Sequence, residues 1–325
     1  MMNITLARRR MLLATAATLL PLAAWTQTDK PIEWVVGYAA GGGSDYVARS
    51  VAVAMTQELG GRPIVISNKP GAATNIAADY VAKSKDYGNV MLTADFATLA
   101  ANPSLFSKLP YNPDSDFQMV GLLARFPMLL VVGPNVPAKN LKEFVAWAKT
   151  KTDPIPYASA GTGSPHHLTG ELFRQKAGLK LQHVPYRGAA PAVQDIVGGQ
   201  IPIGFMDSAS VLQYIASGRL RAIGVASKQR VPTMAEIPTF EEQGLKEVEA
   251  HAWQGVVVPA ATPADVVARL NKALVAALNT TQVKARLQTM ALEPLPGTPQ
   301  QMSDYARAER TRWAKVVREA NIKLD

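Results

Sequence analysis

One unit recurs along this chain: a short run of β-branched residues, then a turn rich in glycine, proline or serine, then a helical pattern. In the clearest copy, a strand expected at 32–36 precedes the turn 39–45 and a helix that Gly60 and Gly61 end. That helix places apolar residues three and four positions apart, along one face. Strand, turn and helix in this alternation predict parallel-dominated sheets flanked by helices.

The unit occurs in two separate stretches, the second of which begins after residue 123. The further strands that the pattern predicts are at 64–66, 90–93, 128–132, 156–158, 184–186, 201–205 and 220–226. A last strand at 253–258 precedes two helices, expected at 263–278 and 299–320, with no strand between them. The order predicts two α/β lobes with a hinge between them. Lobe I comprises residues 27–125 and 250–325, and lobe II comprises residues 126–249.

The first residues predict an export signal. Arg8, Arg9 and Arg10 form a positive segment, and residues 11–24 are an apolar run of 14 residues with one proline. A membrane span needs about 20 apolar residues, so this run is typical of a cleavable signal peptide. We expect the signal to comprise residues 1–26 and to direct the chain to the periplasm by the general or the twin-arginine route.

Composition excludes several classes of function. The chain has no cysteine, which excludes thiol catalysis, disulfides and thiolate metal sites. Its net charge is +9, and loss of the three signal arginines leaves 9 − 3 = +6. This charge is dispersed apart from a basic stretch at 307–318, whose spacing is typical of one exposed helical face. A nucleic-acid partner, which needs a concentrated basic surface, is not expected.

Three turns have the composition of an anion-binding loop. Loops 41–45, 70–75 and 161–164 each follow a strand, contain glycine and open a helix. The free backbone amides and the dipole at a helix N-terminus favour an anion, and ligands of open α/β sheets bind at this edge. Hydroxyl and amide side chains add donors there: Ser44, Thr74, Asn75, Thr162 and Ser164. The alternative is that these are ordinary turns with capping residues.

Nucleotide and catalytic motifs are missing from these loops. No P-loop occurs, and the sequence at 41–46 lacks the last glycine of the dinucleotide fingerprint. No nucleophile elbow or His-Glu-x-x-His motif occurs. His166 and His167 are adjacent, so on a helix they point about 100° apart and cannot share a metal. Ser164 near His166 resembles a nucleophile and base, but a serine and a histidine at the start of a helix are more typical of capping residues. We therefore expect no enzyme activity, no metal and no cofactor.

Nine short motifs follow one another along the mature chain. They are at 41–49 (Gly-Gly-Gly-Ser-Asp, then Ala-Arg), 68–72, 109–111, 157–164, 184–188, 218–222, 237–240, 253–255 and 261–263. In this order they resemble the Bug family of periplasmic receptors, over essentially the whole mature chain.

The resemblance implies a type 2 periplasmic-binding fold that closes on a small carboxylate-bearing ligand. Such receptors supply a tripartite tricarboxylate transporter through its membrane subunits, and they hold carboxylates mainly with loop amides, hydroxyls and water. In agreement, Lys69 and Arg187 are the cations near the loops. We expect a monomer. A ligand-sensing receptor with a signalling partner, and an enzyme on a related fold, are the alternatives.

Two departures from the family pattern bear on the ligand. Ala73 and Thr74 stand where the family has glycines, and Asp95 stands where it has a small residue. A carboxylate at Asp95 repels an anion, so we expect an amino acid, an aromatic acid or a monoacid rather than a plain dicarboxylate. The residues expected to bind the ligand are Tyr38, Gly42, Gly43, Ser44, Asp45, Ala72, Ala73, Thr74, Asn75, Thr93, Asp95, Ser159, Gly161, Thr162, Gly163, Ser164, His166, Tyr186, Arg187 and Asp207.

Overall fold

A computed structural model describes residues 30–324 of the chain, and its strands form one path with the order β2-β1-β3-β9-β4-β7-β5-β6. The predicted signal peptide lies outside the described residues. The strands are β1 (Ile32–Val36), β2 (Ile64–Asn68), β3 (Val90–Asp95), β4 (Phe117–Val132), β5 (Ile155–Ser159), β6 (Leu181–Pro185), β7 (Ile203–Asp207), β8 (Arg221–Val225), β9 (His251–Pro259) and β10 (Glu293–Pro294).

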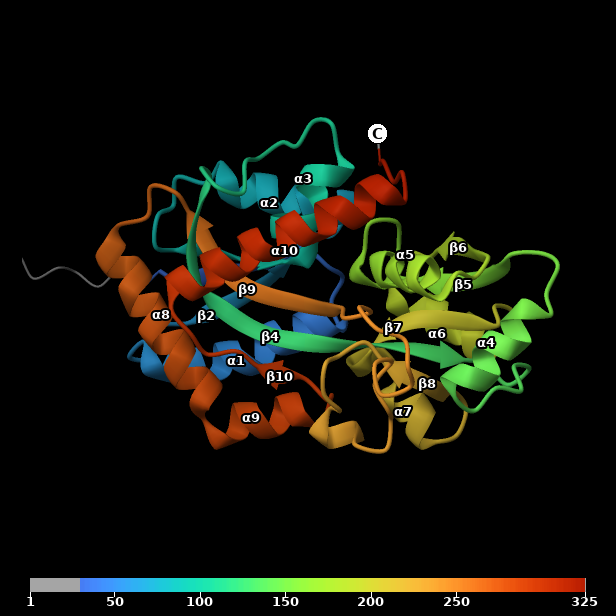
Figure 1. The fold of residues 1–325 in the computed structure, drawn as a ribbon. Coiled ribbons are helices and arrows are strands. Elements are labelled where there is room, and N and C mark those ends of the chain that lie inside the picture. The colour runs from blue at the N-terminus through green and yellow to red at the C-terminus, as the bar shows by residue number, and fades with distance from the viewer. Residues whose placement is uncertain (1–29, 325) are drawn as a thin grey trace, which may run out of the picture. The chain divides into compact units, whose positions relative to one another are not determined.

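Helices cover these strands, and most of them begin at the end of a strand (Figure 1). The longer helices are α1 (Gly43–Glu58), α2 (Asn75–Ala82), α4 (Leu141–Lys149), α5 (Pro165–Ala177), α6 (Ala189–Val197), α7 (Ser208–Ala216), α8 (Ala264–Asn279), α9 (Thr281–Gln288) and α10 (Pro299–Glu319). The short ones are η1 (Ala72–Thr74), η2 (Ala97–Ala101), α3 (Asn102–Leu105) and η3 (Pro232–Met234).

The long strand β4 belongs to both halves of the sheet. Residues 117–127 of β4 pair with β9, and residues 128–132 pair with β7 and β8. Figure 1 shows β4 running from the side of α8 and α10 toward α4 and α7. The sequence predicted only the part at 128–132, because Gln118, Gly121 and Arg125 interrupt the apolar pattern before it. The expected lobe boundary, after residue 125, therefore falls inside one strand.

The sheet is mixed. The outer strands pair in parallel, as the strand–turn–helix pattern predicts, in the pairs β1–β2, β1–β3, β5–β6 and β5–β7. The two strands that join the halves run antiparallel to their neighbours: β3–β9, β4–β9 and β4–β7. Parallel pairs need a crossover helix, whereas β4 and β9 return directly across the sheet.

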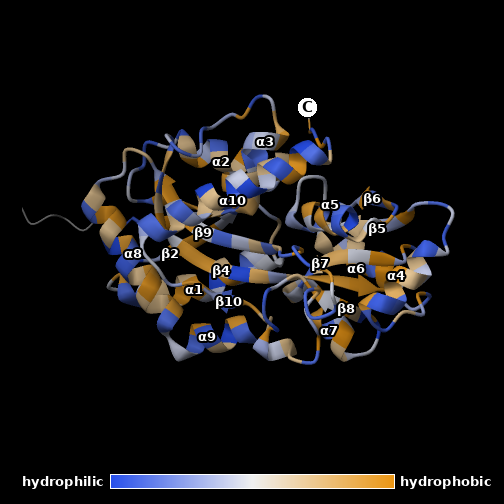
Figure 2. Ribbon diagram, in the orientation of Figure 1, coloured by the Kyte–Doolittle hydropathy of each residue, from blue (hydrophilic) through white to orange (hydrophobic). Residues whose placement is uncertain are grey.

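Apolar side chains fill the space between strands and helices. Trp34 and Trp253, which the sequence assigned to strands, are both fully buried. Phe205 is also fully buried, against Tyr157 and Phe173, so it lies in the core. Figure 2 shows helices with both orange and blue segments, as expected when one face packs on the sheet. Within residues 30–324, no helix is both long and apolar enough to cross a bilayer.

Candidate functional site

The loop before α1 is held by one buried carboxylate. Asp45 accepts hydrogen bonds from the backbone N–H of Gly41 (2.9 Å), from Nε of Arg49 (2.9 Å) and from Nδ2 of Asn68 (3.0 Å). Burial acts to raise the pKa of Asp45, but these donors and the Arg49 charge outweigh it and lower the pKa below its ordinary value. Gly42 caps α1 without a side-chain hydrogen bond, so within residues 30–324 no capping side chain accepts from the first amides of α1.

A second buried carboxylate lies at the end of β3. Asp95 accepts from the backbone N–H of Thr98 and from its hydroxyl, both at 2.9 Å, and from the hydroxyl of Tyr38. Burial raises the pKa of Asp95 in spite of these hydrogen bonds, and burial beside Asp95 also raises the pKa of Tyr38. Asp95 thus fixes Tyr38 and the start of η2.

The loop before α2 has an unusual backbone. Ala72, Ala73 and Thr74 have φ of 47°, 50° and 72°, in the left-handed region, where each non-glycine residue costs about 1–2 kcal/mol. Hydrogen bonds hold the loop there. Thr74 bonds to the hydroxyl of Thr98 (2.9 Å), and Asn102 donates to the Ala73 carbonyl and to the Asn75 side chain, both at 2.7 Å.

In the other half of the sheet, two stacked histidines support the loop before α5. The rings of His167 and His183 are 3.7 Å apart. Nδ1 of His167 accepts from the backbone N–H of Gly163 (3.0 Å), and Nε2 of His183 bonds to the Ser159 hydroxyl (2.6 Å). Burial lowers the pKa of His167 to about 4 and that of His183 to about 3, so both rings are neutral at pH 7. Ser164 caps α5, as predicted, by accepting from the His167 N–H.

A histidine–carboxylate pair joins α5 to α7. Nε2 of His166 lies 2.9 Å from Oδ2 of Asp207, which caps α7 through Ser210. Burial acts to raise the pKa of Asp207, but the hydrogen bonds from His166 and Ser210 lower it overall. Nδ1 of His166 is buried and has no hydrogen-bond partner among the described residues.

The first turns of α1 and α7 meet. A Cβ placed on Gly43 would lie 3.3 Å from the Phe126 ring and 3.8 Å from Cβ of Ala209. The loop before α5 also reaches the other half, because a Cβ on Gly163 would lie 2.6 Å from Leu105. The loops predicted to bind the ligand therefore come from both halves of the sheet and contact the opposite half.

Several other predicted residues use their polar atoms within the protein. The Thr93 hydroxyl accepts from Trp34 (2.8 Å), and the Tyr186 hydroxyl donates to Asp195 (2.6 Å). Burial, together with this hydrogen bond and the Asp195 charge, raises the pKa of Tyr186 to about 12. Arg187 is exposed, and Thr162 and Gly161 are half-buried. Ligand contact by each of the twenty residues stays a prediction.

Gln254 of β9 is a polar residue of this region that the sequence did not select. It is 4% exposed, and its Nε2 donates to the Ser44 hydroxyl. Its Oε1 is buried without a partner among the described residues. The available signal was a polar side chain inside a strongly apolar strand. Its contact with Ser44, 210 positions away along the chain, was not readable from the sequence.

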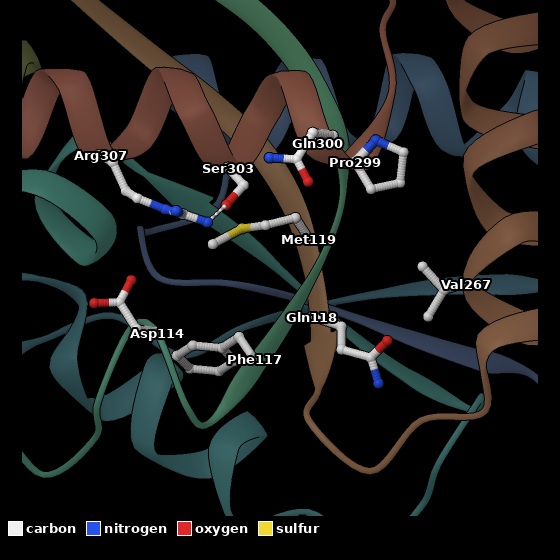
Figure 3. A pocket seen from close by; sticks show the side chains of 9 residues that line it. All are labelled: Asp114, Phe117, Gln118, Met119, Val267, Pro299, Gln300, Ser303 and Arg307. Carbon is white, nitrogen blue, oxygen red and sulfur yellow. Dashed lines mark hydrogen bonds between the residues drawn. The ribbon is translucent and has the colours of Figure 1, made fainter.

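A cavity of about 510 Å³ lies elsewhere, between the start of β4, α8 and α10. Figure 3 shows Arg307 and Ser303 of α10 on one side of it, with Asp114 and Phe117 across from them. None of the twenty predicted residues is among those that line it. Among the described residues, no group of three or more His, Asp or Glu side chains is arranged to hold a metal ion.

Known proteins resemble this chain over most of its length. The profile of a family described as "Tripartite tricarboxylate transporter family receptor" (TctC) matches residues 47–322. Protein BugT of Bordetella pertussis is 33% identical over 313 residues, which cover 96% of each chain. A solved R. palustris protein with adipate is 30% identical, with a TM-score of 0.85 over 90% of this chain and 98% of its own. MatC of Rhodopseudomonas palustris with bound malate is 32% identical, with a TM-score of 0.80 over 88% of this chain and 98% of its own.

Proposed function

Because the chain belongs to the tripartite tricarboxylate transporter receptor family, we propose that it captures a small carboxylate-bearing ligand where the first turns of α1, α5 and α7 approach one another. The predicted Bug resemblance and the predicted α/β periplasmic-binding fold are confirmed by these relatives. Receptors of this family are solute-binding proteins, which is the function that the sequence predicted.

The short distance between Gly43 and Ala209, where a Cβ on Gly43 would lie 3.8 Å from Cβ of Ala209, is the observation that supports this location most. It brings the uncapped first turn of α1 from one half of the sheet against the first turn of α7 from the other. Backbone amides at a helix N-terminus attract a carboxylate without a metal or an arginine cluster. The relatives solved with adipate and with malate are consistent with a carboxylate ligand.

Hydrogen bonds from backbone amides can supply enough free energy to bind a carboxylate ligand. A micromolar affinity corresponds to about −8 kcal/mol. Each charge-assisted hydrogen bond contributes about 1.5–3 kcal/mol, so several of them reach this value after the cost of association.

Two lobes, residues 27–125 with 250–325 and residues 126–249, close on the ligand by bending where β4 passes from one half to the other after Pro127 and where the chain returns at the start of β9. The receptor acts in the periplasm after removal of its signal peptide, as a monomer, and passes the ligand unchanged to the membrane subunits of its transporter.

Mass spectrometry of the purified protein tests the proposal. We expect gentle denaturation to release a small carboxylic acid, and incubation with the protein to leave that acid unchanged. A Gly43→Ala variant should bind it about tenfold more weakly, because the new methyl group would lie between α1, Phe126 and Ala209.

A matched control is Gly198→Ala at the end of α6, where a Cβ also finds its nearest neighbour at 3.3 Å. This variant should bind normally. Chemical conversion of the acid, or equal binding by the Gly43→Ala and Gly198→Ala variants, would contradict the proposed function or its location.

A further inference from the structure

The side-chain amide of Gln254 is fixed at the N-terminus of α1. Gln254 lies on β9, and its Nε2 donates to the hydroxyl of Ser44 in the first turn of α1. With 4% of the residue exposed, the amide has little freedom to turn toward solvent. Its two polar atoms therefore both lie beside the helix end where we place the ligand carboxylate.

One of those atoms has no partner in the part of the chain that the structure describes. Oε1 of Gln254 is buried and accepts no hydrogen bond from the described residues. Buried acceptors in native proteins are nearly always satisfied, and leaving one unpaired is costly. The atom therefore points to a donor that is not part of the chain.

The surroundings of Oε1 define what that donor can be. Asp95 is the cross-strand partner of Gln254, so both side chains lie on the same face of the sheet. The Asp95 carboxylate and Oε1 are acceptors, whereas the first amides of α1 are donors. A complementary ligand has an anionic group for the helix end and, close to it, an O–H or N–H group for the acceptors. An unsubstituted methylene chain offers Oε1 no donor.

We infer that Gln254 is a specificity-determining residue that accepts a hydrogen bond from a hydroxyl or amino substituent near the ligand carboxylate. The inference rests on the proposed function. The expected ligands are hydroxy or amino carboxylic acids. Gln254 would make the protein prefer them to acids of the same length that lack the hydroxyl or amino group.

Calorimetric titration with matched acids tests the inference. The pairs are malate and succinate, glutamate and glutarate, and lactate and propionate, whose members differ in one hydroxyl or amino group. We expect the wild-type protein to bind the substituted member of at least one pair about tenfold more tightly. In Gln254→Met, which keeps the side-chain length and removes the amide, this preference should disappear.

Two further variants keep the result interpretable. Gln254→Asn retains an amide but withdraws it by one bond, and it should also lose the preference. Gln175→Met removes another amide with an unpaired buried nitrogen, in the last turn of α5, and it should keep the preference.

The outcomes distinguish this inference from the proposed function. Binding of the acids with no preference in the wild type, or with the same preference in Gln254→Met, overturns the inference and leaves the receptor function standing. Failure of all six acids to bind overturns the assigned ligand class, while mass spectrometry of the co-purified acid still tests the receptor function separately.

Discussion

At the scale of single residues, polar side chains in the candidate site have two different tasks. Ser159, Ser164 and Thr74 hold loops in place through bonds to the protein. Gln254 and His166 each keep one buried polar atom that has no partner within residues 30–324. From the sequence, hydroxyl side chains near glycine were predicted to bind the ligand because they are good hydrogen-bond donors. The sequence does not show which of these hydroxyls already bond to other groups of the protein. That depends on partners such as His183, 24 positions from Ser159.

The left-handed loop before α2 gives a prediction at this scale. Ala73 has φ 50°, which glycine adopts without a steric penalty. We expect Ala73→Gly to raise the free energy of unfolding by about 1 kcal/mol, measured by urea denaturation. The control is Ala285→Gly, because Ala285 is an exposed residue inside α9. This variant should lower the free energy of unfolding by about 1 kcal/mol. A loss of stability in both variants would show that the Ala73 backbone is not strained.

At the scale of elements, three buried histidines link stability to pH. Burial lowers the pKa of His167 to about 4, and that of His183 and His251 to about 3. In the unfolded chain a histidine has a pKa of about 6.5. Below pH 6.5 the unfolded state therefore binds protons that the folded state does not, and folding stability is lost as pH falls.

We expect the free energy of unfolding to fall between pH 6.5 and 4.5, by up to about 1.4 kcal/mol per pH unit for each histidine. His251→Phe should reduce this slope by about one histidine's share, because it removes one of the three titrating groups. The pKa of Asp95 is raised in the folded protein, so protonation of Asp95 makes the free energy of unfolding rise as pH falls, opposite to the effect of the histidines. Denaturation curves at five pH values measure the slope, and a stability that is constant or rises toward pH 4.5 would contradict the assignment.

Most elements were readable from local pattern, because helices such as α4 begin at a recognisable cap. Asn140 is the N-cap of this helix, and its side chain accepts from the Glu143 N–H. The sequence missed α9, β10 and the first part of β4. The last two owe their place to pairing across the sheet, where Glu293 and Pro294 lie opposite Arg125 and Ala124. Such pairing is absent from any local window of sequence.

At the scale of the whole molecule, β4 and β9 connect the two halves and α10 returns to the first half. The alternation of strands and helices was enough to predict two α/β halves and this return. It could not show that one strand, β4, would serve both halves, because the switch occurs at Pro127 within a continuous strand. A bend there changes the distance between the loops on either side, and this is why we place the closing motion at these strands.

The central claim is that the ligand binds where α1 and α7 meet, and a crystal structure of the protein with its co-purified acid tests it most directly. We predict carboxylate oxygens within about 3 Å of backbone nitrogens in the first turn of α1, with the rest of the ligand near Gln254. A ligand seated instead in the cavity between β4, α8 and α10, beside Arg307 and Asp114, would contradict the account.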